Sequence, residues 1–272
     1  MQPASRAAMA TVRERLETRI ADVGAPELNR LGEELGGVAA VLGKEPVIRR
    51  DLADSAAPEQ VRKGMVETLF GGKISPLTVQ TLGDVVASRW SRPLDMVEGI
   101  EQLATQALLT VAERDGSLEE VEDELFRFGR ILVAQPRLAT LLADESAPAA
   151  RRVELLDAVL ADRTRPVTRA LLEQVVRAPR RRKLDEIVEG LVDRAAARRE
   201  RSVAHVTAAG PLLQRQEQRL LDVLNRIYRR PISLKIDLDP ELLGGLVIRV
   251  GDEVIDGSVA ARLEAARQWM SR

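Results

Sequence analysis

The sequence repeats itself at an offset of 90 residues, and this repeat limits the possible folds more than any other feature. The register holds without a gap from Leu28 and Leu118 to Asp95 and Asp185. Matched pairs include Leu42 and Leu132, Pro46 and Pro136, Ala57-Pro58 and Ala147-Pro148, and Pro76 and Pro166. Two alanine- and leucine-rich helical segments can look alike by chance, but the shared prolines favour a duplication. We therefore expect two related helical domains.

Each copy has the same pattern of helices and stops. Apolar residues recur at spacings of three and four, as in Leu28, Leu31 and Leu35, which is typical of an amphipathic helix. Proline ends or redirects one helix at Pro46 and Pro136 and opens another at Pro76 and Pro166. Antiparallel helices joined by short turns should result.

The boundary between the copies falls in a long apolar segment. Residues 96–114 could close the first bundle, open the second, or do both as one shared helix. Just after it, Ser117 and Glu120 have the spacing of a capping box, which predicts a helix start there.

The pattern changes after about residue 200. Alternating polar and apolar residues in 232–238 are typical of a half-buried strand, while Leu220, Leu221, Leu224 and Ile227 should share one side of a helix. We expect strands at 202–208, 232–238, 246–250 and 253–255, and helices at 214–228 and 259–270. The predicted fold is mainly α: two related antiparallel helical bundles followed by a small α/β C-terminal domain.

Composition argues against several classes of function. The 41 basic and 42 acidic residues nearly cancel, so no overall field attracts nucleic acid, and aromatic residues make up only 2% of the chain. The chain has no cysteine and a single histidine, His205, which removes thiolate and two-histidine metal sites. No apolar run reaches the roughly 18 residues that span a bilayer. We expect no catalytic residue, no metal and no cofactor.

Two glycine clusters invite a phosphate-binding interpretation. Neither Gly244-Gly245 nor Gly71-Gly72-Lys73 has the spacing of a Walker or dinucleotide loop, and the second lies among helices with no preceding strand. We expect Gly244, Gly245 and Gly251 to shape turns instead, with Asp256 or Ser258 capping the last helix.

The C-terminal residues resemble a known family. The runs HVTAAGPL at 205–212 and RRPISLKIDLDPELLGGLVIRVGDEVIDGSVAARLE at 229–264 are similar to the signature of the delta subunit of bacterial F-type ATP synthase, the oligomycin-sensitivity-conferring protein family. The matching residues are Asp239, Pro240, Gly244, Gly245, Gly251, Asp256, Gly257, Ser258 and Arg262. The resemblance covers roughly residues 98–272, and the extra copy ahead of it resembles the enlarged actinobacterial form.

This resemblance implies a function and a set of partners. It implies a non-catalytic stator adaptor of the proton-translocating rotary ATP synthase, present once per complex, that joins the peripheral-stalk b subunit to the alpha and beta subunits of the catalytic head. Membrane association, at the cytoplasmic face of the cell membrane, would come only through the complex. The expected domains are an extra bundle at 1–98, the family's helical bundle at 99–201 and a stalk-binding domain at 202–272.

The resemblance further implies a site for an alpha-subunit helix on the second copy, and an amphipathic helix can lie in a groove between two helices. The candidate wall residues are Leu103, Ala107, Val111, Val167, Ala170 and Leu171. The alternative for each of these residues is plain bundle core. The basic residues between Arg177 and Lys183 could likewise bind acidic partners or form a solvated turn.

Two other functions stay open from sequence alone. One is a helical-repeat scaffold of another multiprotein assembly, and the other is an enzyme that uses the glycine-rich tail. For residues 1–95 we expect a spacer or additional stalk-binding role, and we expect the rest of the chain to fold without them.

Overall fold

The computed structural model describes residues 2–161, 163–180, 182–201, 203–228, 232–239, 242–251 and 253–270. By its internal contacts the chain divides into two units. The first, here called the helical unit, comprises residues 1–112 and 120–193, and the second, here called the C-terminal unit, comprises 113–119 and 194–272. Both copies of the repeat therefore contribute to the helical unit.

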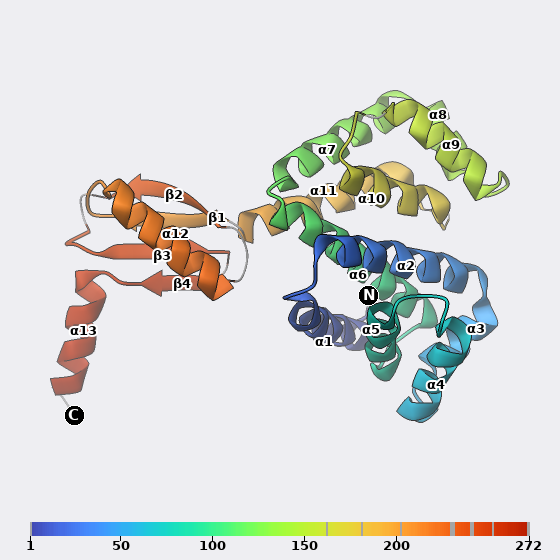
Figure 1. Cartoon of the computed structure of the whole chain (residues 1–272), viewed down its shortest axis with the longest axis horizontal. Helices are drawn as coiled ribbons and strands as arrows, with labels where there is room; N and C mark the ends of the chain where they lie inside the picture. The colour runs from blue at the N-terminus through green and yellow to red at the C-terminus, as the bar shows by residue number, and fades with distance from the viewer. Residues whose placement is uncertain are drawn as a thin grey trace. The chain divides into compact units, whose positions relative to one another are not determined.

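The first copy is built from six helices whose starts are largely set by proline. They are α1 (Pro3–Ile20), α2 (Ala25–Lys44), α3 (Pro46–Ala53), α4 (Glu59–Phe70), α5 (Pro76–Ala87) and α6 (Pro93–Arg114). Proline occupies an initial helical position in α1, α2, α3 and α5, where its missing amide costs no intrahelical hydrogen bond. Short turns then fold the helices against one another (Figure 1).

The second copy reproduces these helices at the predicted offset. Its elements are α7 (Leu118–Ala134), α8 (Pro136–Ala143), α9 (Ala149–Leu160), α10 (Pro166–Arg177) and α11 (Leu184–Arg201). Both ends of α8, α9 and α10 lie 90 residues after the ends of α3, α4 and α5. Related helical bundles, predicted from the sequence, are thus confirmed.

A partly buried carboxylate repeats along with the helices. In the first copy Glu34 Oε2 accepts hydrogen bonds from Thr78 Oγ1 at 2.6 Å and from the backbone amide of Ser75 at 2.9 Å. In the second copy Glu124 Oε2 accepts from Thr168 Oγ1 at 2.5 Å and from the amide of Arg165 at 2.9 Å. Each carboxylate satisfies amide and hydroxyl donors at a helix start, which ties α2 to α5 and α7 to α10.

Helix α6 belongs to both copies. As the first helix of the second copy, α6 corresponds at the 90-residue offset to α1 of the first copy. As the last helix of the first copy, it corresponds to α11 of the second copy. Every residue from Leu103 to Glu113 is buried, and a helix buried on all sides lies in the middle of a packed body. Of the possibilities for this segment, the shared helix is the one observed.

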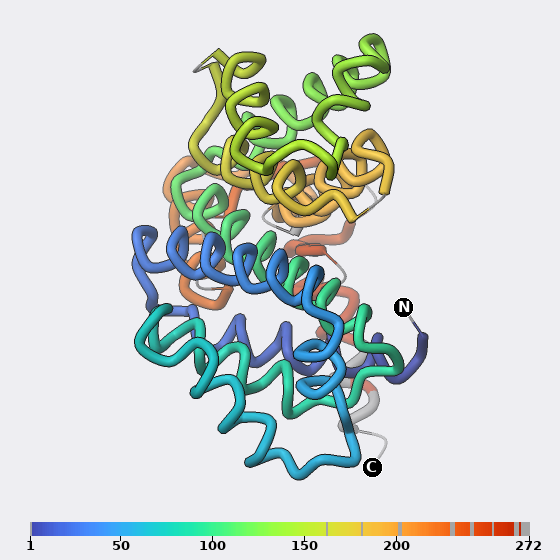
Figure 2. Tube along the Cα trace, turned by 90° about the vertical axis from the view of Figure 1, so that its right-hand side faces the viewer, coloured from blue at the N-terminus to red at the C-terminus, as the bar shows by residue number. Residues whose placement is uncertain are grey.

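The two copies also meet through α2 and α10. Gly32 of α2 lies so close to Leu108 of α6 that a Cβ there would fall 2.6 Å from Leu108 Cγ. One turn on, Gly36 packs against the side chain of Gln174 in α10, and Gln174 Nε2 donates to the carbonyl of Gly32 at 2.9 Å. Figure 2 shows α2 running beside α6 in this way. The copies thus form one packed body.

The C-terminal unit holds a four-stranded sheet and α12 (Gln214–Tyr228). The strands are β1 (Val203–Ala208), β2 (Ser233–Leu238), β3 (Leu246–Val250) and β4 (Glu253–Asp256), in the order β2-β1-β3-β4. Strand β1 pairs parallel with β2 and antiparallel with β3, and β3 pairs antiparallel with β4. The last helix is α13 (Val259–Met270), and each of these elements lies where the sequence pattern predicts it.

The core of this unit lies between α12 and one face of the sheet (Figure 1). Ala204 and Val206 of β1 pack with Ile248 and Val250 of β3 under Leu224. The prediction of the apolar face of α12 is wrong in part. Leu220, Leu224 and Tyr228 pack in the core, whereas Ile227 is 58% exposed. A four-residue spacing therefore describes the buried face better than the predicted set. None of the helices within the described ranges is long and apolar enough to cross a membrane.

Candidate partner-binding surfaces

The paired glycines of the C-terminal signature make a turn that side chains would block. Gly244 and Gly245 have φ values of +142° and +86°, in the region that favours glycine. A Cβ on Gly245 would lie 2.4 Å from the carbonyl oxygen of Gly257 and 2.9 Å from Cα of Ser258. The turn thus lies directly against the start of α13, and its glycines permit that approach.

Backbone hydrogen bonds join the same two stretches. The amide of Gly257 donates to the carbonyl of Leu246, and the amide of Val259 donates to that of Gly244, both at 2.9 Å. Asp256 Oδ1 accepts from the amide of Ser258 at 2.9 Å, and these hydrogen bonds from Ser258 hold the pKa of Asp256 below its usual value. The amides of Gly257, Ser258 and Val259 are thus bonded within the chain and are not free to bind a phosphate.

Ser258 is the cap of α13, one of the two candidates that the sequence offered. Its hydroxyl oxygen accepts from the amide of Ala261 at 3.1 Å, and its carbonyl accepts from the amide of Arg262. Farther back, the amide of Asp239 bonds to the carbonyl of Ala208, and Gly251 turns the chain between β3 and β4 with φ +59°. Pro240 lies outside the described residues.

The two signature stretches meet at a pocket of about 600 Å³ in the C-terminal unit. One wall is the end of β1 with the following Gly210-Pro211-Leu212, and another is Gly245-Leu246. Leu220 and Val223 of α12 complete the lining together with Gln216 and Arg219. Segments that resemble the family signature are therefore neighbours in space, although more than 30 residues separate them in the sequence.

The six residues predicted to line a helix-binding groove are mostly core. Leu103, Ala107 and Val111 are buried in α6, and Val167 and Leu171 are buried in α10, while Ala170 is partly exposed. The physical reason is the shared position of α6, which has neighbours from both copies. The core interpretation accounts for these residues in the chain alone, and their contact with a partner helix stays a prediction.

The basic segment after α10 is largely neutralised by the chain's own carboxylates. Arg180 and Arg182 both bond to Glu101 of α6, the latter at 3.2 Å. Arg177 pairs with Glu173 at 2.6 Å and Lys183 with Glu186 at 3.0 Å, and Arg181 lies outside the described residues. Burial raises the pKa of the Glu101 carboxyl, against the opposing charges of Arg180 and Arg182. This segment therefore fastens α10 to α6.

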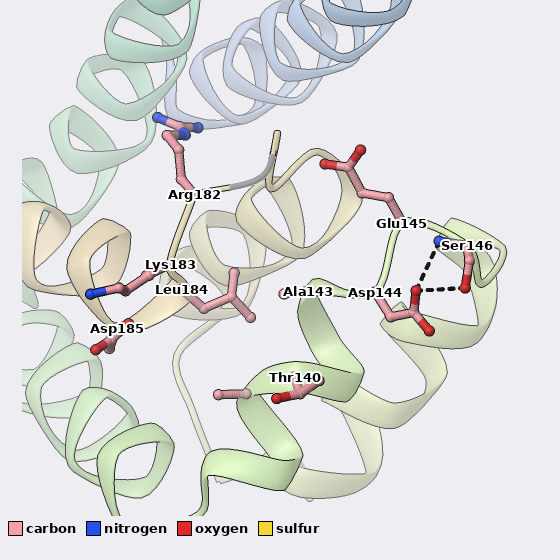
Figure 3. Close-up of a pocket in the computed structure, with 10 residues that line it drawn as sticks. Thr140, Ala143, Asp144, Glu145, Ser146, Arg182, Lys183, Leu184 and Asp185 are labelled. Carbon is pink, nitrogen blue, oxygen red and sulfur yellow. Dashed lines mark hydrogen bonds between the residues drawn. The ribbon is translucent and has the colours of Figure 1, made fainter.

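A second open pocket of about 600 Å³ lies between the end of α8 and the start of α11 (Figure 3). Asp144 bonds to the amide and hydroxyl of Ser146 at 2.9 and 2.6 Å, which lowers its pKa. The first copy has the same turn, where Asp54 Oδ1 accepts from the amide of Ala56. Lys183 is paired with Glu186 and Arg182 with Glu101, so these two cations and Asp144 are bonded to neighbouring residues of the chain.

Comparison with known proteins gives consistent matches over the whole chain. The family described as ATP synthase delta (OSCP) subunit matches residues 100–270. A protein of Streptomyces griseus named ATP synthase subunit delta is 42% identical over 271 residues, with both chains covered completely. One of Frankia casuarinae with the same name is 43% identical, again over the full length of both.

Two further comparisons differ in length or in strength. A Mycobacterium protein (strain KMS) named ATP synthase subunit b-delta is 43% identical over 98% of this chain, which spans 60% of that protein. A chain of the mitochondrial ATP synthase hexamer of Toxoplasma gondii has 20% sequence identity and a TM-score of 0.31, over 62% of this chain and 95% of that one.

Proposed function

The chain belongs to the ATP synthase delta (OSCP) subunit family, and from that premise we propose that it is a non-catalytic stator adaptor of the rotary ATP synthase. In this role it links the peripheral stalk to the catalytic head and resists the torque that the rotor exerts on the head. The observation that carries the proposal is the end-to-end identity of 42–44% with proteins named as this subunit. That identity includes the first copy, which lies ahead of the family match at residues 100–270.

The proposed partners are the alpha and beta subunits of the head and the b subunit of the stalk. Residues 99–201 would contact the alpha subunit, and residues 202–272 would contact b. The Mycobacterium relative supports the pairing with b, because its printed name joins b and delta and this chain matches 60% of it. We propose one copy per complex, located at the cytoplasmic face of the membrane and held there by the other subunits.

The packing of the helical unit fits a part that must not yield under torque. Helix α6 is shared by both copies, α2 packs on α6 and α10, and the ion pair of Arg180 with Glu101 joins the end of α10 to α6. Close-packed interiors have low compressibility and transmit strain. The residues 1–98 would therefore act as a stiffening spacer or as an additional stalk contact.

Reconstitution tests this proposal directly. Membranes carrying a synthase stripped of its delta subunit should regain ATP-driven proton pumping when the purified chain is added. The purified chain should show no ATP hydrolysis by itself, and it should bind a peptide made from the N-terminus of the alpha subunit. Full pumping in the stripped membranes without the chain, or ATP turnover by the chain alone, would contradict the proposal.

A further inference from the structure

The outer side of α7 exposes large apolar side chains among its charged residues, although the matching positions of α2 pack against the second copy. Phe126 and Val133, seven residues apart on one side of α7, are 56% and 66% exposed. At the 90-residue offset they correspond to Gly36 and Gly43 of α2. Gly36 lies against Gln174, and a Cβ on Gly43 would lie 3.4 Å from Cδ of Arg180. The first copy thus uses this face to pack on the second, and the second copy leaves it open.

Such an open face at the end of a stacked array is unusual. In repeat proteins, each unit covers the next, and the terminal unit carries a polar outer face that keeps the array soluble. Here the last copy carries a phenylalanine and a valine at positions where the preceding copy has glycines. Large apolar side chains in place of a cap indicate a surface that another helix covers.

A second copy of this chain fits that face poorly. Within one chain, α2 of the first copy packs on α6 and α10 of the second. If α7 packed on a further molecule in the same manner, it would meet that molecule's α1 and α5, which correspond to α6 and α10 at the 90-residue offset. The residues that α2 contacts, Leu108 and Gln174, would then be replaced by Thr18 and Asp84. Asp84 is paired with Arg15 and Arg19, so a polar, charged surface would meet Phe126 and Val133.

The charge between the two apolar residues indicates the chemistry of the occupant. Arg130 is exposed and lies between Phe126 and Val133 on the same side of α7. Its neighbours three and four positions away are Phe126, Arg127, Val133 and Ala134, so α7 provides no carboxylate at helical pairing distance. An amphipathic helix with apolar residues three or four apart and a nearby carboxylate would cover the apolar pair and neutralise Arg130.

We propose that the α7 face formed by Phe126, Arg130 and Val133 is a docking site for an amphipathic, acidic-flanked helix of another subunit of the complex. The inference rests on the proposed function, because that function supplies an assembly in which such a helix can reside. The face belongs to α7 and is exposed, whereas the six groove residues belong to α6 and α10 and are mostly buried. It is thus an additional contact.

The absence of cysteine from the chain allows a clean test. A Val133→Cys variant carries the sole thiol, and its labelling by a maleimide is timed in the free chain and in the assembled, purified synthase. We expect labelling to slow by about tenfold or more on assembly, because a docked helix excludes the reagent. The control is Val47→Cys on α3, where the side chain is 63% exposed and the repeat equivalent is Arg137.

The outcomes separate the two proposals. If assembly into a complex that contains the chain slows maleimide labelling at position 133 no more than labelling at position 47, the docking site is overturned. The adaptor function then still stands. A chain that never joins the complex overturns both. A bifunctional thiol-to-amine cross-linker attached to the introduced thiol of the Val133→Cys variant should join the chain to a different subunit, and a product containing two copies of this chain would overturn the assignment of the occupant.

Discussion

A single carboxylate, Glu34, organises the junction between α2 and α5. Its side chain is 15% exposed and receives hydrogen bonds from Thr78 and from both the amide and hydroxyl of Ser75, with Arg30 beside it. Burial by itself would raise the pKa of Glu34, but these hydrogen bonds outweigh burial and lower it to about 2. The ionised form is therefore the one that the folded chain stabilises.

Replacing Glu34 with glutamine should destabilise the helical unit at neutral pH. A depressed folded-state pKa contributes stability that is present above the ordinary value of 4.5 and is lost as the pH falls toward about 2. Glu34→Gln should cost about 1–2 kcal/mol at pH 7, because charged hydrogen bonds are lost. Urea unfolding monitored by circular dichroism should show this difference shrinking below pH 4.5.

The adjacent residue provides the control for that experiment. Glu33 is exposed on the same helix, and Glu33→Gln should change the urea midpoint by much less. Equal effects of the two substitutions, or an effect of Glu34→Gln that persists unchanged at pH 3, would show that the hydrogen-bonded carboxylate is not the stabilising feature.

Gly245 should tolerate no side chain. Its φ of +86° is unfavourable for other residues, and a Cβ would fall 2.4 Å from a backbone oxygen that no rotamer change can move. Gly245→Ala should lower the stability of the C-terminal unit by about 2–4 kcal/mol, with α13 displaced. Amide hydrogen exchange in residues 242–263 measures this.

Gly210→Ala is a suitable control for Gly245, because no atom lies within 4 Å of the corresponding Cβ and its φ is not in the positive region. That variant should keep the wild-type exchange rates. Wild-type protection in Gly245→Ala would mean that the close approach to Gly257 is not needed for the fold.

Two glycines of α2, one against α6 and one in open space, allow the packing between helices to be tested. A Cβ on Gly32 would strike the buried Leu108 of α6, whereas a Cβ on Gly37 would meet nothing within 4 Å. Gly32→Ala should therefore destabilise the helical unit by about 1–3 kcal/mol through overpacking. Gly37→Ala should stabilise it by up to about 1 kcal/mol through helix propensity. Thermal unfolding of both variants checks the opposite signs, and a stabilised Gly32→Ala would contradict the packing of α2 on α6.

Helix boundaries were predictable because local chemistry sets them. Proline at Pro46, Pro76, Pro136 and Pro166 fixes where helices start, and glycine with alternating apolar residues fixes the strands after residue 200. The start of α7 after Ser117 was also predictable, although Ser117 and Glu120 bond to other residues and not to each other as a capping box. Ser117 Oγ donates to Asp115 at 2.5 Å, and Glu120 pairs with Arg165 of the same copy.

Surfaces were harder to predict, because exposure depends on which helix lies opposite. Leu103 and Phe126 are both apolar residues on long helices, but Leu103 is fully buried and Phe126 is 56% exposed. Periodicity cannot distinguish these cases. The first copy has Gly36 where the second copy has Phe126. This difference is visible in the sequence and indicates different neighbours, since a glycine on one face of a helix permits close packing that a phenylalanine prevents.

The whole helical unit depends on its first copy more than the sequence suggested. Residues 1–95 were expected to be separable, but Ser5 of α1 donates to the buried Asp95 at 2.7 Å, and α2 covers Leu108 and contacts Gln174. Removing α1 to α5 would expose apolar side chains of α6 that are now fully buried. Independent folding of the remainder is therefore not expected from this structure.

Deletion of residues 2–91 should leave a chain that unfolds at lower urea concentration and associates in solution. Exposing the buried surface of α6 removes about 25 cal/mol of stabilisation for each Å² of apolar area returned to water. Sedimentation analysis should show concentration-dependent association, because large exposed apolar patches drive it. The C-terminal unit, whose core of Ala204, Val206, Leu224, Ile248 and Val250 contains no residue of the first copy, should keep its hydrogen-exchange protection. A monomeric deletion variant with wild-type stability would show that the copies are independent domains, and coupling defects could then be assigned to a lost contact instead of to a weakened fold.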